Sequence, residues 1–371
     1  MKPTSRRNFL FMSAGAAATL AFAACSRGGV GEDRTDLNPP NFEIDGDLAY
    51  FAPTGYVPDE VIVAFEQEHG VKVKQTYFST VDEMIQKLGA GASYDITFMP
   101  SNFFGRATAA NLLLPIDHSL MPNWGEVTEL FNDPPFEPKA EHLAGPYAMG
   151  GIGLAYRKSK VAALTGSWGD LWDLAPSLDR RAFIFDDVTV SMTMALARLG
   201  LPTDTGSADD LNRAADSLIE LRRSLGGFGS SAGEKLTNGE GDLLMNYTGA
   251  TLTALKEAPF ADDIGFEFCK ETLAFNSDCL AIPSAAKHPG TGLVFADYLL
   301  RPDNMAKIVD FVGYPIATKT GLSTYSGLVA KYPFLEYDEQ VLSDPAIWLA
   351  SLQDTQLTAW NQAWTRVKAS A

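Results

Sequence analysis

Histidine and cysteine are scarce in this chain, which limits the chemistry that it can perform. Its 371 residues include four histidines and three cysteines. None of the histidines, at positions 69, 118, 142 and 288, has the H-x-x-x-H or H-E-x-x-H spacing of a zinc site. The sequence also has no Walker loop and no G-x-G-x-x-G segment after a predicted strand, so the usual nucleotide-binding loops are missing. We therefore expect neither a metal nor a cofactor.

Long apolar runs are equally scarce, and the one that is present lies near the N-terminus. It spans residues 9–24 and overlaps Ser5-Arg6-Arg7-Asn8-Phe9-Leu10, which has the form of a twin-arginine export signal. The run ends in small residues before Cys25, as in the signal of a bacterial lipoprotein, where Cys25 would be lipidated and anchor the protein to a membrane. A plain secretory signal cut near Ala24 is the alternative. Either signal predicts a periplasmic or cell-surface protein.

Positive charge is also in short supply. The chain has 29 lysines and arginines against 46 aspartates and glutamates, a formal net charge of −17. Such an excess of negative charge repels nucleic acid and anionic lipid and mildly favours cationic solutes. We therefore expect no nucleic-acid partner.

Two cysteines remain beyond the signal, Cys269 and Cys279, and they flank a predicted turn. An exported protein lies in an oxidising compartment, where a disulfide between them is one outcome. The sequence does not fix the strand register that disulfide geometry requires, so free thiols are the other outcome.

The length of the chain predicts two domains after a flexible tether at residues 26–46. The first part alternates strands and helices, which is typical of an α/β domain with a mostly parallel sheet. The predicted elements are strands at 48–51, 71–77 and 94–99 and helices at 58–69 and 81–88. In such sheets ligands lie beyond the carboxyl ends of the strands, which indicates Pro53–Tyr56 and Ser101–Phe104.

A second domain is predicted to begin near Gly145, with a strand over 149–156. Further strands are expected at 242–247 and 264–269, and helices at 189–199, 209–225, 292–300, 303–311 and the C-terminus. No internal repeat is evident.

Asp278 stands at the head of a short apolar strand, Leu280–Ile282, that Pro283 ends. A carboxylate that enters a core costs several kcal/mol unless a cation or hydrogen-bond donors meet it. Aromatic and acidic residues recur at other predicted strand ends and turns: Tyr56, Phe103, Asp187, Tyr247, Phe275 and Tyr314. Aromatic faces and carboxylates together suit an amine, whereas the alternative is that the aromatics are core and Asp187 caps a helix.

Gly229-Ser230-Ser231-Ala232-Gly233 matches the G-x-S-x-G pattern of serine hydrolases. That motif needs a strand before the serine, and the pattern here predicts a helix instead. A secreted hydrolase that uses Ser231 is therefore a remote alternative, and we expect no catalytic residues.

In their order along the chain, several segments resemble the bacterial extracellular solute-binding proteins of the spermidine/putrescine type, the ligand receptors of ABC importers. The matching segments are Thr54–Pro58, Tyr94–Ser101, Gly145–Tyr147, Ser167–Trp172, Asp186–Asp187, Asp278–Pro283, Leu299–Pro302 and Gly313–Pro315. The resemblance implies an α/β, two-lobed periplasmic-binding-protein fold of type II. Lobe 1 would comprise residues 47–148 and 279–316, and lobe 2 residues 149–278 and 317–371. The ligand would lie in the cleft between mixed, mostly parallel sheets flanked by helices.

The resemblance also implies partners and a ligand site. The partners would be a small cationic ligand, similar to putrescine or spermidine, and the permease subunits of an ABC transporter, with the receptor itself a monomer. Carried over by position, the ligand-binding residues would be Thr54, Tyr56, Ser101, Phe103, Asp187, Tyr247, Asp278 and Tyr314.

Three positions depart from the family's pattern. Pro53 and Asn276 stand where tryptophan is common, and Val190 stands where a second terminal acid is common. Two stacking surfaces and one carboxylate are thus missing, which favours a smaller amine over a long polyamine clamped at both ends. A compact amine or an amino-acid-like solute is the alternative ligand.

Overall fold

The structure, a computed structural model, describes residues 37–137, 142–229, 232–336, 341–342 and 344–370. Cys25 and Ser231 lie outside these residues, as do the predicted signal and part of the predicted tether. Along the described ranges, no helix has the length and apolar character needed to cross a membrane.

The first sheet has five strands in the order β2-β1-β3-β10-β4. Strand β1 pairs in parallel with β2 and β3, whereas β10 pairs antiparallel with both β3 and β4. The strands are β1 (Leu48–Ala52), β2 (Val73–Tyr77), β3 (Ile96–Pro100), β4 (Gly145–Gly150) and β10 (Asn276–Ala281). The parallel part is the predicted β-α-β-α-β unit, and β10 is the strand that carries Asp278.

The second sheet has the order β7-β6-β8-β5-β9. Strand β6 pairs in parallel with β7 and β8, and β5 pairs antiparallel with β8 and β9. The strands are β5 (Ile152–Arg157), β6 (Ala182–Ile184), β7 (Leu225–Phe228), β8 (Leu243–Tyr247) and β9 (Ile264–Glu267). Both sheets are therefore mixed, and neither closes into a barrel.

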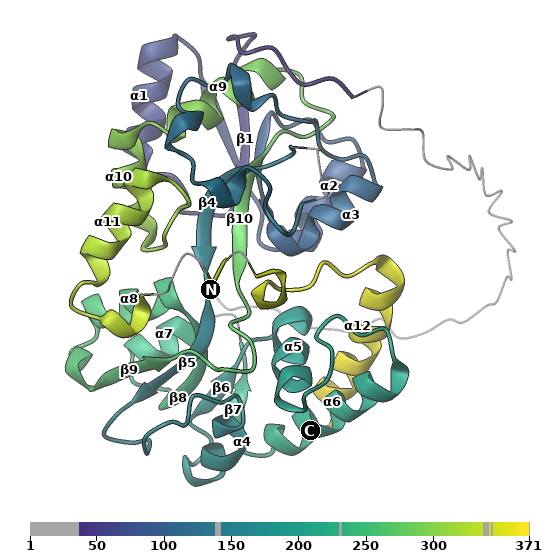
Figure 1. Cartoon of the computed structure of the whole chain (residues 1–371), viewed down its shortest axis with the longest axis vertical. Helices are drawn as coiled ribbons and strands as arrows, with labels where there is room; N and C mark the ends of the chain where they lie inside the picture. The colour runs from purple at the N-terminus through teal and green to yellow at the C-terminus, as the bar shows by residue number, and fades with distance from the viewer. Residues whose placement is uncertain (1–36, 138–141, 230–231, 337–340, 343, 371) are drawn as a thin grey trace, which may run out of the picture. The chain divides into compact units, whose positions relative to one another are not determined.

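The chain passes from the first sheet to the second at Gly151, between β4 and β5 (Figure 1). The sequence pattern predicts one strand over 149–156, but the structure has two strands in two sheets. A side chain at Gly151 would come within 3 Å of the rings of Phe268 and Phe275, so only glycine fits where the strand changes sheets.

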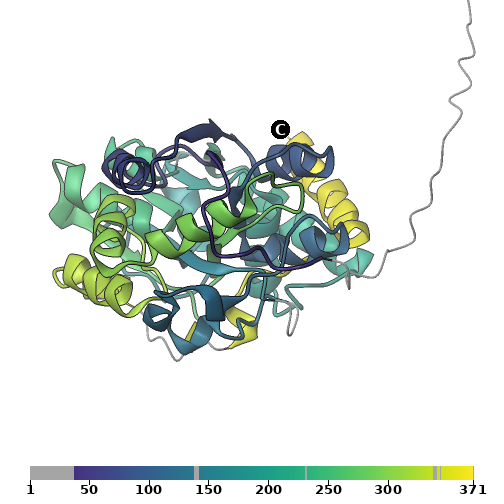
Figure 2. The same cartoon turned by 90° about the horizontal axis from the view of Figure 1, so that it is seen from above.

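Six helices accompany the first sheet, and four of them, α1, α2, α9 and α10, lie where the sequence pattern predicts helices. Helix α1 buries Val61, Ile62 and Phe65, and Gly70 ends it in a left-handed conformation. Figure 2 shows α1 near α9, and the rings of Phe65 and Phe295 lie 4.9 Å apart, edge to face. These helices are α1 (Asp59–His69), α2 (Val81–Gly89), α3 (Phe104–Ala109), α9 (Pro289–Leu299), α10 (Pro302–Val312) and α11 (Lys319–Val329).

Helices of the second group accompany β5–β9. They are α4 (Asp170–Leu174), α5 (Val188–Arg198), α6 (Ala208–Arg222), α7 (Ala232–Thr237), α8 (Thr248–Glu257) and α12 (Asp354–Ala369). The C-terminal α12 packs on α5 and α6, with Trp360 and Trp364 buried (Figure 1). The predicted C-terminal helix thus contributes to this core.

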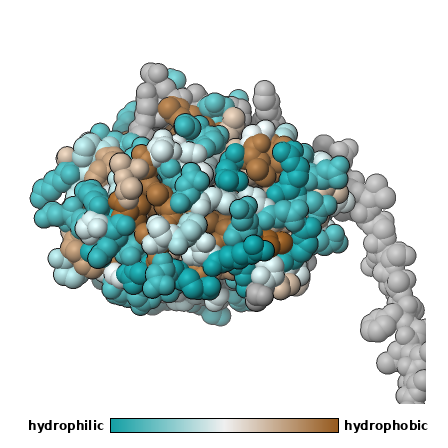
Figure 3. Space-filling view, turned by 90° about the horizontal axis from the view of Figure 1, so that it is seen from below, coloured by the Kyte–Doolittle hydropathy of each residue, from teal (hydrophilic) through white to brown (hydrophobic). Residues whose placement is uncertain are grey.

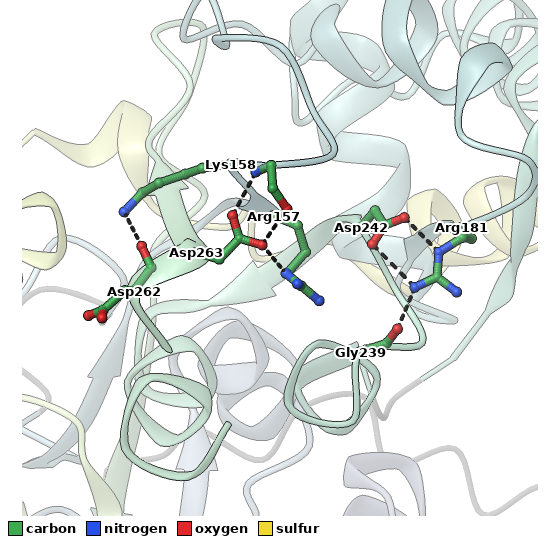
Figure 4. A network of polar contacts seen from close by, with 8 residues as sticks. Arg157, Lys158, Arg181, Gly239, Asp242, Asp262 and Asp263 are labelled. Carbon is green, nitrogen blue, oxygen red and sulfur yellow. Dashed lines mark hydrogen bonds and ion pairs between the residues drawn. The ribbon is translucent and has the colours of Figure 1, made fainter. Parts of the chain in front are cut away.

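Ion pairs fix the ends of the second sheet (Figure 4). Nε of Arg157 at the end of β5 lies 2.6 Å from the Asp263 carboxylate, just before β9. Nε of Arg181 lies 2.6 Å from the Asp242 carboxylate, and these residues precede the neighbouring strands β6 and β8. Asp242 is 4% exposed, so its carboxylate needs this partner.

The structure contradicts the expected context of the G-x-S-x-G segment. The predicted helix over 209–225 ends at Arg222, and β7 follows it, so a strand precedes Gly229 and α7 begins at Ala232. All four histidines lie on or beside elements of the first sheet, whereas β7 and α7 belong with the second.

Cys269 and Cys279 are both buried free thiols, so they do not form the disulfide that the sequence left open.

Figure 3 shows hydrophobic patches interrupted by hydrophilic residues on the face seen from below. Large hydrophobic side chains that are exposed come from separate elements, for example Val63 of α1 and Phe311 of α10.

Candidate ligand-binding cleft

A cavity of about 360 Å³ lies where elements of both sheets meet. Its walls combine apolar, aromatic and acidic side chains, and among the residues that the structure describes no lysine, arginine or histidine lines it. The lining residues are Tyr56, Val81, Pro100, Asn102, Phe103, Ala148, Gly150, Asp187, Val190, Tyr247, Asn276, Asp278, Tyr314 and Leu349. The described residues contain no cluster of three or more side chains suited to a metal ion.

Strand pairing brings distant lining residues together. Asn276 at the start of β10 pairs with Gly150 at the end of β4, and Tyr247 pairs with Ile152 at the start of β5. Asp278 pairs with Pro100 at the end of β3. The cavity therefore lies where the crossing strand leaves one sheet for the other and beyond the carboxyl end of β3, as expected for an open α/β sheet.

Asp278 has an aromatic partner. The Tyr56 hydroxyl donates a hydrogen bond to Oδ2 of Asp278, and the Tyr147 hydroxyl donates to the backbone oxygen of Tyr56. The Tyr56 and Tyr147 rings stack with centroids 5.8 Å apart. Desolvation raises the pKa of Asp278 from its ordinary 3.8 to about 6, although the Tyr56 hydrogen bond lowers it. The site thus holds a carboxylate whose negative charge is poorly compensated by the protein.

Asp187 is the second carboxylate of the cavity and also the N-cap of α5. Its Oδ1 accepts a hydrogen bond from the Val190 N–H at 2.9 Å. Asp187 is exposed at the mouth of the cleft, but many protein atoms surround its carboxylate. The resulting loss of hydration raises the pKa of Asp187. The capping role anticipated from the sequence is therefore real, and it does not remove Asp187 from the cavity.

Tyr314 and Tyr247 form an aromatic wall. The Tyr314 ring packs over Gly249 and Gly150, and a Cβ at Gly249 would overlap the ring. Tyr247 lies against Phe185, with ring centroids 4.9 Å apart. Burial raises the pKa of both tyrosine hydroxyls, so they are neutral at physiological pH. The wall offers aromatic faces to a cation without a competing charge.

Six of the eight predicted site residues line the cavity: Tyr56, Phe103, Asp187, Tyr247, Asp278 and Tyr314. Thr54 and Ser101 do not. Thr54 is exposed in the turn after β1, and Ser101 is fully buried behind Asn276. The buried ring of Phe275 packs against Trp348 instead of facing the cavity.

Sequence reasoning missed Val81, Asn102 and Leu349, which also line the cavity. Asn102 lies within Ser101–Phe104, the segment that the sequence pattern indicated for ligand binding, so its position in the sequence could have identified it. Leu349 comes from an irregular segment whose backbone N–H donates to the Phe275 oxygen at 2.8 Å. No periodic pattern marks such a segment.

Two mixed sheets joined by a crossing strand, with a cavity at the crossing, define a two-lobed binding protein of the periplasmic type II class. A family model described as bacterial extracellular solute-binding protein matches residues 60–334, which is more than half of the chain. The chain belongs to this family.

Several known proteins are similar to this chain. The putrescine-binding periplasmic protein PotF of Escherichia coli (strain K12) is 29% identical over 331 residues, which cover 84% of this chain and 89% of the relative. The putrescine-binding periplasmic protein SpuD of Pseudomonas aeruginosa (strain UCBPP-PA14) is 27% identical over 329 residues, with the same two coverages. A putative spermidine/putrescine ABC transporter structure from Listeria monocytogenes superposes with a TM-score of 0.79 at 22% identity, covering 88% of this chain and 100% of that one.

Proposed function

We propose that this protein is the extracytoplasmic receptor of an ABC importer, and that it binds a polyamine or polyamine-like cation in the cleft. The observation that carries the proposal is Asp278, a desolvated carboxylate in the wall of an aromatic cavity whose described lining residues include no basic side chain. The names of the similar proteins, which are putrescine and spermidine/putrescine binders, support the same ligand class.

The charges and walls of the cleft fit a protonated amine. Asp278 and Asp187 supply two negative charges, and Tyr56, Tyr247 and Tyr314 supply ring faces. An ammonium group gains a charge-assisted hydrogen bond from a carboxylate and roughly 0.5–2 kcal/mol from each desolvated aromatic face. An anionic ligand would meet two like charges and no counter-charge in the cavity walls.

The remaining expectations belong to the same proposal. The protein acts by binding and lobe closure without catalysis, as a monomer, and it delivers its ligand to permease subunits.

It is exported, with Cys25 as the lipid anchor. The predicted bounds are 47–148 with 279–316 for lobe 1 and 149–278 with 317–371 for lobe 2, whereas β10 already begins at Asn276 in the first sheet and α11 accompanies that sheet.

A second candidate ligand is a compact amine or an amino-acid-like solute. It is favoured by Val190 and Asn276, which line the cavity where the resemblance would place an acid and a tryptophan. A pocket without those groups holds one end of a long polyamine less firmly.

Thermal unfolding with a panel of solutes tests the proposal. Putrescine and spermidine should raise the midpoint of unfolding, because a ligand that binds only the folded state stabilises it by mass action. Stabilisation by amino acids would favour the second candidate ligand, and sugars serve as negative controls. The stabilisation should disappear in Asp278→Ala. A panel in which no amine raises the midpoint would contradict the proposal.

A further inference from the structure

Two carboxamide side chains, Asn102 and Asn276, line the cavity together with its acids. Asn102 is 8% exposed and is the second residue after the end of β3. Within the described residues its side chain has no protein hydrogen-bond partner, although it borders the cavity. Its amide atoms are not among the fully buried unpaired polar atoms, so they remain accessible from the cavity to water or to a ligand.

Asn276 differs from Asn102 because a buried serine fixes its orientation. The Ser101 hydroxyl donates to Oδ1 of Asn276 at 2.6 Å and accepts a hydrogen bond from the Ser277 N–H at 3.2 Å. A hydroxyl has one proton, and that proton is committed to the amide oxygen. The Nδ2 group has no protein acceptor among the described residues, so the N–H groups are what Asn276 offers to the cavity.

A simple alkyl diamine does not match this donor. Its protonated ends only donate, and its methylene groups neither donate nor accept. Bound in the cavity, such a ligand would satisfy the carboxylates of Asp187 and Asp278 but would cover the Asn276 N–H groups without an acceptor. Covering a donor in this way costs about as much as a lost hydrogen bond.

The acceptor on the ligand must also be uncharged. A ligand carboxylate would accept from Asn276, but it would lie close to Asp278, and the described part of the cavity wall supplies no lysine or arginine. Like charges without a counter-ion in a partly desolvated site are strongly unfavourable. An ether, hydroxyl or carbonyl oxygen accepts the same hydrogen bond without that repulsion.

We propose, resting on the proposed function above, that the preferred ligand is a cationic amine that also carries a neutral hydrogen-bond acceptor within reach of Asn276. Asn276 is the residue that selects for the acceptor. Ser101 is a positioning residue, since it touches no part of the cavity and acts by holding the amide oxygen away from the ligand. Ser101, which the sequence predicts to contact the ligand, lies behind Asn276 and would act through that residue.

A matched pair of ligands tests the proposal. Cadaverine and bis(2-aminoethyl) ether are both dications at neutral pH and differ only in the central atom, a methylene group in one and an ether oxygen in the other. Titration calorimetry of the purified protein at pH 7.5 should give about 2- to 10-fold tighter binding of the ether, the range expected for one net hydrogen bond.

Variants assign the preference to the amide. Asn276→Leu should reverse it in favour of cadaverine, and Ser101→Ala should shrink it because the amide is then free to rotate. Asn276→Asp keeps the shape of the side chain but replaces the donor with an acceptor, so this variant should also bind cadaverine more tightly than the ether. It provides the same test if Asn276→Leu does not fold.

The outcomes separate this inference from the proposed function. Equal or tighter binding of cadaverine by the wild-type protein would overturn the inference and leave the amine receptor intact. A preference for the ether that survives in Asn276→Asp would also overturn it. If neither diamine nor putrescine binds, both the inference and the proposed function fail.

Discussion

The Tyr56 hydroxyl donates a hydrogen bond to Oδ2 of Asp278, a residue 222 positions further along the chain. The turn after β1 and the start of β10 are thereby joined at the cavity. Because the tyrosine supplies one neutral donor to a desolvated carboxylate, most of the charge of Asp278 is left for a ligand.

Amine binding should weaken below about pH 6. Burial raises the pKa of Asp278 to about 6, and the carboxyl group must be ionised to pair with an ammonium group. Binding should therefore release protons near pH 6, and the affinity should fall by up to about tenfold for each pH unit below that value. Calorimetric titrations of putrescine between pH 5 and pH 8, in buffers of different ionisation enthalpy, measure both effects. An affinity that is constant over this range would argue against Asp278 as the binding carboxylate.

Asp278→Asn should stabilise the ligand-free protein at neutral pH. The folded-state pKa of Asp278 is raised above its ordinary 3.8, so its contribution favours folding below about pH 4 and is lost as the pH rises through about 6. The variant lacks this penalty. Its unfolding midpoint should exceed that of the wild type at pH 7.5, and the difference should shrink towards pH 4.5. The same midpoint difference at both pH values would contradict the assignment.

Gly249→Ala should weaken amine binding with little loss of stability. A Cβ at Gly249 would overlap the ring of Tyr314, which must then leave its place in the cavity wall. Gly327→Ala in α11 is the matched control, since a Cβ there meets nothing within 4 Å. The control should stabilise the protein by about 0.5–1 kcal/mol through helix propensity and should leave binding unchanged. Equal affinities of the two variants would show that Tyr314 is not a wall for the ligand.

Asp95→Ala should be strongly destabilising. The buried Asp95 carboxylate accepts hydrogen bonds from the N–H groups of Ala49, Lys287 and His288, at 2.7, 3.0 and 2.8 Å. Its loss leaves buried donors without an acceptor, and each costs about 1–3 kcal/mol. Urea unfolding should show a loss of at least about 3 kcal/mol, with a smaller loss in Asp95→Asn, which keeps one acceptor oxygen. A loss below about 1 kcal/mol in the alanine variant would show that these donors find other partners.

The elements with strong local signals could be predicted from the sequence. Helix α1 has an apolar stripe and a glycine stop, and the parallel strands around it alternate with helices, so the parallel part of the first sheet could be predicted. Strand β7 was missed because Leu225 continues the leucine spacing of α6, and Gly226 and Gly227 lack the side chains that mark a strand. The change of sheet at Gly151 depends on contacts with Phe268 and Phe275, which are distant in the sequence.

The candidate site was predictable where a charge or an aromatic ring stood at a strand end, as at Asp278 and Tyr247. It was not predictable where the role depends on a partner. Ser101 was expected to touch the ligand, but its hydroxyl is used by Asn276. Asn276 was noted only for the tryptophan that it replaces, because the orientation of its amide depends on a contact between β10 and the residue after β3.

The central claim is that Asp278 makes this cleft a receptor for a protonated amine, and titration calorimetry of putrescine into the wild type and Asp278→Asn at pH 7.5 tests it most directly. The account predicts saturable binding to the wild type and a loss of at least tenfold in affinity in a variant that remains folded. Putrescine binding of equal affinity in the two proteins, or no binding to the wild type, would contradict it.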